Sequence, residues 1–60
     1  MTTLTIPATK SLWRDEVLNI TYLVIGVSGA EALVVCRHGN RRWNDAIHLS
    51  LFNSELTEVN

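Results

Sequence analysis

The chain has 60 residues, a formal net charge of −1 at pH 7, 47% hydrophobic residues and one cysteine. This length sets a limit of one domain, residues 1–60, and a chain this short buries only about 60% of the surface that its unfolded form exposes. The single Cys36 excludes an intramolecular disulfide, and without a signal-peptide pattern it favours a reducing, cytoplasmic setting. The balanced charge excludes a protein-wide field that attracts nucleic acid. No apolar run approaches the roughly 20 residues of a membrane-spanning helix, so no membrane partner is expected.

The first segment, residues 1–10, alternates threonine with apolar residues and contains Pro7. Leu4 and Ile6 are compatible with a short edge strand, where proline is tolerated because one side of the strand needs no hydrogen-bond donors. The alternative is a frayed terminus without regular structure.

Residues 12–20 fit two interpretations. In a helix, four apolar side chains lie near one face: Leu12, Trp13, Val17 and Ile20. In the other interpretation a strand ends at Trp13, residues 14–16 turn, and a second strand begins at Val17. We favour strand, turn and strand, because a helix of this length is only marginally stable.

The central feature of the sequence is a pair of apolar runs, residues 21–27 and 32–38, separated by a short Ser/Gly turn. Both runs are rich in β-branched and aromatic residues, which predicts an antiparallel hairpin. In the second run, Leu33 and Val35 are expected in the core. Gly26 inside the first run predicts a bulge, which would let a small sheet curl back on itself.

A second turn is predicted at residues 38–41, where Gly39 and Asn40 can both adopt a positive φ. A third strand over residues 42–49 then places four side chains on one face: Trp43, Asp45, Ile47 and Leu49. Asp45 is the discordant member of that face, so we expect a bend near residues 44–45.

Residues 50–54 suit a single 3-10 turn, and residues 56–59 alternate apolar and polar side chains as a last strand does. The sequence therefore predicts an all-β fold, a small five-stranded SH3-like barrel with one short 3-10 turn before the last strand. A curled barrel also removes most of the exposed edges of a flat sheet. The predicted core contains Leu23, Ile25, Leu33, Val35, Ile47, Leu51, Phe52 and Leu56.

Several short segments carry a family resemblance. Leu12-Trp13-Arg14-Asp15, Leu51-Phe52 and Leu56-Thr57-Glu58-Val59 resemble small proteins encoded by lambdoid phages and enterobacterial prophages. Tyr22-Leu23-Val24, Val34-Val35-Cys36-Arg37, Trp43 and Phe52 are also similar to a short bacterial SH3-like family of unknown function. The resemblance covers residues 12–59 and departs at Glu16-Val17, where a glycine is expected in the first turn. It implies a fold and a phage-like origin, and it carries no catalytic residues.

The candidate binding site is the segment around the second turn. Its residues, with Arg14 as a neighbour, are Arg37, His38, Arg41, Arg42 and Trp43. Arginine binds carboxylate and phosphate groups bidentately, so the segment could hold a protein partner, or a nucleic acid with Trp43 stacked on a base. The further alternative is a solvated hairpin tip with Trp43 in the core. The balanced net charge favours a protein partner over a nucleic acid.

Cys36, His38 and His48 are the candidate metal ligands, but a buried structural cysteine and two surface histidines are the simpler interpretation. Covalent catalysis by the cysteine would need an adjacent base in a cleft, and a barrel of this size has little room for a substrate pocket. The acidic side chains are scattered and form no acid–base pair: Asp15, Glu16, Asp45, Glu55 and Glu58. We therefore expect no enzyme activity, no cofactor and no metal.

The sequence favours a non-enzymatic protein-binding module, a phage or prophage accessory protein with an unidentified protein partner. The alternative is a small nucleic-acid-binding β-barrel that uses the arginines and Trp43 of the second turn. A homodimer through a sheet edge or an apolar patch is a further hypothesis, because both faces of residues 22–27 are apolar and the chain is short of core.

Overall fold

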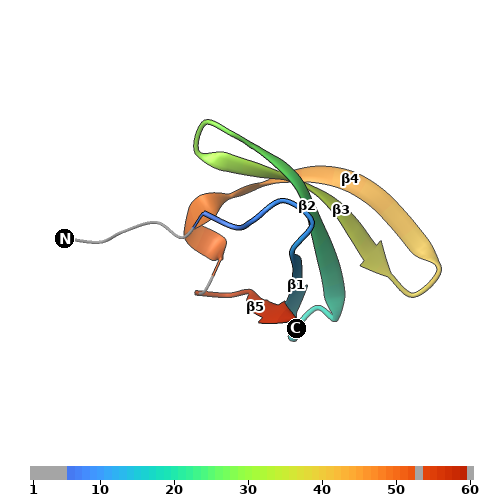
Figure 1. Ribbon diagram of the computed structural model, residues 1–60. Coiled ribbons are helices and arrows are strands. Elements are labelled where there is room, and N and C mark those ends of the chain that lie inside the picture. Colours follow the sequence, from blue (N-terminus) through green and yellow to red (C-terminus); the bar gives the residue numbers. More distant parts are fainter. Residues whose placement is uncertain (1–5, 53, 60) are drawn as a thin grey trace.

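The computed structural model of the chain describes residues 6–52 and 54–59. Five antiparallel strands form a single sheet in the order β4-β3-β2-β1-β5 (Figure 1). They are β1 (Leu12–Asp15), β2 (Ile20–Ser28), β3 (Glu31–His38), β4 (Arg41–His48) and β5 (Thr57–Val59), with a 3-10 turn η1 (Leu49–Leu51) before β5. The all-β class, the five strands and the 3-10 turn are therefore confirmed. The sheet is not closed, since β4 and β5 are its two edges in the described residues, and the predicted barrel is not confirmed.

Two-residue turns join β2 to β3 and β3 to β4, so the predicted central hairpin is confirmed. In each turn the first central residue is a glycine, Gly29 or Gly39, with a φ of 61°. The second central residue, Ala30 or Asn40, does not take a positive φ. This combination is that of a type II′ turn, whose twist matches the twist of the flanking strands.

Residues 12–20 form strand, turn and strand, the favoured interpretation, and not a helix. Asp15 Oδ1 accepts hydrogen bonds from the N–H groups of Val17, at 3.0 Å, and Leu18, at 3.1 Å. Asn19 ends the turn with a φ of 60°, a conformation that asparagine adopts more readily than most residues. The turn occupies residues 16–19, later than the predicted 14–16, because the Asp15 carboxylate organises the residues that follow it.

One face of the sheet, the core face, carries most of the buried side chains: Trp13, Tyr22, Val24, Ala32, Val34 and Cys36. Leu49, Phe52 and Leu56 cover this face from the segment between β4 and β5. The rings of Trp13 and Phe52 meet edge to face, with centroids 5.0 Å apart and planes at 84°. The indole N–H of Trp13 donates to Ser11 Oγ at 2.9 Å, so the one polar atom of that ring is satisfied at the margin of the core.

The predicted core is only partly correct. Phe52 and Leu56 are buried, and Ile47 and Leu51 pack against the core partly buried. The prediction is wrong for four residues that are absent from the core cluster: Leu23, Ile25, Leu33 and Val35. Alternation predicts which side chains share a face, but in strands that are apolar on both faces it does not predict which face is covered.

The predicted bulge at Gly26 is confirmed. The pairing of β2 with β3 moves from Val24–Val34 to Gly26–Leu33, which leaves Ile25 as the extra residue. β4 has no bulge near residues 44–45, where a bend was predicted, because it pairs with β3 in one unbroken register. The strand accommodates the polar side chain of Asp45 because seven of the eight residues of β4 are exposed.

The N-terminal segment lies against β2 without joining the sheet. Leu4, part of the predicted edge strand, lies outside the described residues, and residues 6–11 are not in a strand. The N–H of Lys10 donates to the carbonyl of Val24 at 2.7 Å, and the N–H of Val24 donates to the carbonyl of Ser11 at 3.0 Å. No helix in residues 6–52 and 54–59 has the length and apolar character needed to cross a membrane.

Candidate functional site

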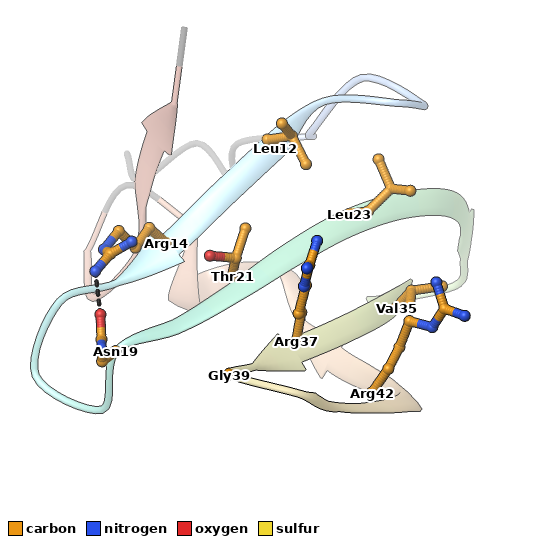
Figure 2. A pocket seen from close by; sticks show the side chains of 9 residues that line it. All are labelled: Leu12, Arg14, Asn19, Thr21, Leu23, Val35, Arg37, Gly39 and Arg42. Atoms are coloured by element: carbon orange, nitrogen blue, oxygen red, sulfur yellow. Dashed lines mark hydrogen bonds between the residues drawn. The ribbon is translucent and has the colours of Figure 1, made fainter.

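The face of the sheet opposite the core, the outer face, carries two rows of side chains that run across the strands (Figure 2). Residues directly opposite each other on paired strands lie on the same face, so the rows follow from the strand register. They are Leu12, Leu23 and Val35, the aliphatic row, and Arg14, Thr21, Arg37 and Arg42, the arginine row. Together with Asn19 and Gly39 the two rows line a hollow of about 510 Å³.

The arginine row brings like charges together. Arg37 on β3 and Arg42 on β4 are direct cross-strand partners, and Arg14 reaches the same row through Thr21 on β2. Like charges directly opposite each other destabilise a sheet. An anion bound between the guanidinium groups would remove this repulsion, so the row is a candidate anion-binding surface.

The carboxylates of the strands lie away from the arginine row. Asp15, Asp45 and Glu58 are paired with Ile20, Val34 and Trp13, which lie in or against the core, so all three carboxylates are on the core face. Glu31 is on the outer face, but it begins β3 and the arginine row crosses the other end of that strand. The outer face therefore concentrates positive charge although the chain has a net charge of −1.

The aliphatic row lies beside the arginine row and is open to solvent. Leu12 is 42% exposed, and Leu23 and Val35 are half-buried. Among the described residues, those that line the hollow above them belong to the sheet and its turns. Arginine is enriched at protein–protein interfaces, and the centre of such an interface is more apolar than the rest of the protein surface.

A side-chain hydrogen bond holds one end of the arginine row. Arg14 Nη2 donates to Asn19 Oδ1, and Asn19 is fixed in turn by the left-handed conformation that ends the β1–β2 turn (Figure 2). A guanidinium group has five N–H donors. The bond to Asn19 therefore orients Arg14 while most of its donors stay available for a ligand.

The structure divides the predicted site between the two faces of the sheet. Arg14, Arg37 and Arg42 are on the outer face, whereas Arg41 and Trp43 are paired with His38 and Cys36 and lie on the core face. His38, Arg41 and Trp43 line a second hollow of about 350 Å³ with Leu18 and Ile20. Trp43 is 37% exposed, so it is not the core residue of the solvated-tip alternative.

Sequence reasoning missed the five residues of the outer hollow that lie outside the second turn and Arg14: Leu12, Asn19, Thr21, Leu23 and Val35. A signal for part of this arrangement was present. A two-residue turn at Gly39 and Asn40 places Arg37 opposite Arg42 by counting outward from the turn. The same count places Arg41 opposite His38 and Trp43 opposite Cys36, on the other face of the sheet from Arg37 and Arg42.

The candidate metal ligands do not come together. Cys36 is buried on the core face and His38 is exposed. His48 lies at the other end of β4, where its Nδ1 accepts a hydrogen bond from the N–H of Ser50 at 3.1 Å and caps η1. In the part of the chain that the structure describes, no group of three or more His, Cys, Asp or Glu side chains is arranged to hold a metal ion.

Burial raises the pKa of the Cys36 thiol, and the carboxylate of Asp45 raises it further. The thiolate is the nucleophilic form of cysteine, and a raised pKa lowers its population at neutral pH. Cys36 therefore has the properties of a core side chain.

Comparison of the chain with protein-family models, with curated proteins and with solved structures finds no match.

Proposed function

We propose that the chain is a non-enzymatic SH3-like binding module that holds a protein partner on its outer face. The observation that carries the proposal is the aliphatic row beside an arginine row in which Arg37 directly opposes Arg42. Five antiparallel strands with a 3-10 turn before the last one support the SH3-like type. A phage or prophage origin and a cytoplasmic setting, in which Cys36 stays reduced, complete the proposal.

The chemistry of the two rows defines the partner. A carboxylate matches the donor geometry of a guanidinium group, and an aliphatic side chain matches the row of Leu12, Leu23 and Val35. We therefore propose an acidic segment that also carries aliphatic residues. Its carboxylates would lie over the arginine row while its aliphatic side chains cover the aliphatic row.

The distribution of aromatic side chains favours a protein over a single-stranded nucleic acid at this face. Binding of single strands relies on aromatic rings that stack on successive bases. Among the described residues the aromatic side chains are on the core face or in the segment that covers it: Trp13, Tyr22, Trp43 and Phe52. The arginine row therefore has no aromatic partner on its own side of the sheet.

A second candidate function rests on the other hollow. There, Trp43 is partly exposed and shares the lining with Arg41 and His38. The exposed indole could stack on a base while the neighbouring cation binds the phosphate of the same strand. This arrangement supports a nucleic-acid-binding module as the alternative function.

Selection of random peptides on the immobilised chain tests the main proposal. We expect the selected peptides to be rich in Asp, Glu and aliphatic residues. The double variant Arg37→Ser/Arg42→Ser should weaken their binding about tenfold or more, because hydrogen bonds to charged groups each contribute about 1.5–3 kcal/mol. Arg41→Ser is the matched control, since it removes one arginine of the adjoining turn from the opposite face and should leave the affinity unchanged.

A single-stranded oligonucleotide serves as the second ligand in the same measurement. If Arg41→Ser and Trp43→Ala abolish oligonucleotide binding and Arg37→Ser/Arg42→Ser does not, the second candidate function is correct. Peptides without acidic residues, or equal losses for the double variant and the Arg41→Ser control, would show that the outer face is not the working surface.

A further inference from the structure

The edge strand β4 is long, exposed and regular. It has eight residues, of which seven are exposed, whereas β5 at the other edge has only three residues. Its pairing with β3 runs from Arg41 to His48 without a shift, and it contains no proline. Proteins usually interrupt or shorten such edges, because an unpaired strand edge is a template for pairing with another strand.

One hydrogen bond shows which backbone groups of β4 point away from β3. The N–H of Ala46 donates to Asp45 Oδ1 at 2.8 Å. It is therefore directed away from the ladder with β3. Since alternate residues of an antiparallel strand face the same neighbour, the N–H groups of Arg42 and Asn44 also point outward, to the open side of the sheet.

We propose that β4 pairs with β4 of a second copy of this chain, antiparallel, about a two-fold axis at Trp43. The two sheets then form one continuous sheet, and two copies of the same surface face each other as a two-fold interface requires. The pairing uses the outward groups of Arg42 and Asn44. It leaves the bond between the Ala46 N–H and Asp45 intact.

Electrostatics selects this register from the alternatives. In a two-fold antiparallel pair, opposite residues share a face, so one residue of β4 lies directly opposite its own copy with the axis between them. An axis at Arg42 sets Arg42 against its own copy, and an axis at Asp45 sets Asp45 against its own copy. Both place like charges directly opposite each other, which is destabilising.

Among axes at residues 42–45, the two remaining registers differ in what faces Asp45. An axis at Asn44 sets Asp45 against Trp43 and needs the Ala46 N–H that Asp45 already binds. An axis at Trp43 sets Arg41 of each copy against Asp45 of the other copy, on the same face of the sheet. It also brings the two indoles together across the axis, where aromatic cross-strand pairs are favourable.

Charge reversal on β4 tests the register. We measure the mass of the full chain by sedimentation from micromolar to millimolar concentration, and we expect a monomer–dimer equilibrium. Arg41→Asp and Asp45→Arg each put like charges opposite each other twice and should weaken dimerisation at least about tenfold. The double variant Arg41→Asp/Asp45→Arg should restore it. Arg42→Asp is the control, because in this register it faces the uncharged Asn44.

A mixing experiment makes the test independent of how well each variant folds. The Arg41→Asp and Asp45→Arg chains complement each other at every charged pair in this register. Mixed together they should form a heterodimer, although neither forms a homodimer alone. A wild-type monomer at all concentrations, a mass larger than a dimer, a mixture that stays monomeric, or an Arg42→Asp control as weak as the single variants overturns the proposal.

Discussion

Cys36 is the one titratable residue that is almost completely buried among the described residues. It is fully buried in the core, and its neighbour Tyr22 on β2 is buried as well. Burial is the main cause that raises the pKa of each group, and the charges of Cys36 and Asp15 contribute further to the rise at Tyr22. Both groups are therefore held in their neutral, protonated forms by the fold.

The sign of the resulting pH dependence follows from proton binding. Above the ordinary cysteine pKa of 9.0 the folded chain retains a proton that the unfolded chain releases. The free energy of unfolding should therefore be independent of Cys36 below pH 9.0 and fall as the pH rises from there towards the raised pKa. Tyr22 should steepen the fall above pH 10.0 in the same way.

Urea denaturation at a series of pH values checks this expectation. Cys36→Ala should lower the stability at neutral pH by about 1 kcal/mol through lost burial, and it should flatten the fall that begins near pH 9.0. Tyr22→Phe should keep the fall in stability that begins near pH 9.0 and lose the additional fall above pH 10.0. A Cys36→Ala curve that runs parallel to the wild-type curve would show that the thiol does not titrate differently on folding.

At the scale of the elements, the two type II′ turns determine how the central three strands are joined. Gly29 and Gly39 have a φ of 61°, and apart from its two chain neighbours neither has an atom within 4 Å of the position of an added Cβ. Substitution to alanine therefore meets no side-chain clash, and its effect is backbone strain alone. We expect Gly29→Ala and Gly39→Ala each to lower the free energy of unfolding by about 1–3 kcal/mol.

Gly26 is the matched control for these two variants. It also has open space at the Cβ position, but its φ is not positive. Gly26→Ala should therefore change the stability by about 0.5 kcal/mol or less. Thermal unfolding followed by circular dichroism ranks the three variants. Equal losses at all three positions would mean that the turns do not depend on the positive φ.

The elements were predictable from the sequence because glycine marks turns and β-branched residues mark strands, as residues 21–37 illustrate. The buried face was not predictable, because Leu23 and Val24 are equally apolar and only the covering segment decides between them. The opposition of Arg37 and Arg42 could be counted from the turn. The place of Arg14 in the same row could not, because it depends on a turn that Asp15 shifts to residues 16–19.

At the scale of the whole molecule, residues 6–52 and 54–59 form one sheet that is covered on one face. The cover is the segment of Leu49, Phe52 and Leu56, and the contact of Phe52 with Trp13 ties it to β1. The opposite face carries the aliphatic and arginine rows and stays open. This asymmetry separates the residues that fold the chain from those that we propose for binding, so each set can be altered without the other.

Phe52 tests how far the fold depends on its cover. At about 0.05–0.15 kcal/mol per residue, a chain of 60 residues has a free energy of unfolding of about 3–9 kcal/mol. Phe52→Ala should lower it by about 3–5 kcal/mol, because it removes a buried ring and leaves a cavity against Trp13. A loss of this size is a large fraction of the total, so we expect a much lower urea midpoint than that of the wild type.

Two companions of Phe52→Ala isolate the effect of packing. Phe52→Leu keeps most of the apolar volume and should lose only about 1–2 kcal/mol. Val17→Ala, at a residue that is 93% exposed in the β1–β2 turn, should change the stability by less than about 0.5 kcal/mol. Near-ultraviolet circular dichroism during urea unfolding reports the order of the Trp13 ring in each variant. If Phe52→Ala keeps the wild-type spectrum and midpoint, the sheet folds without its cover.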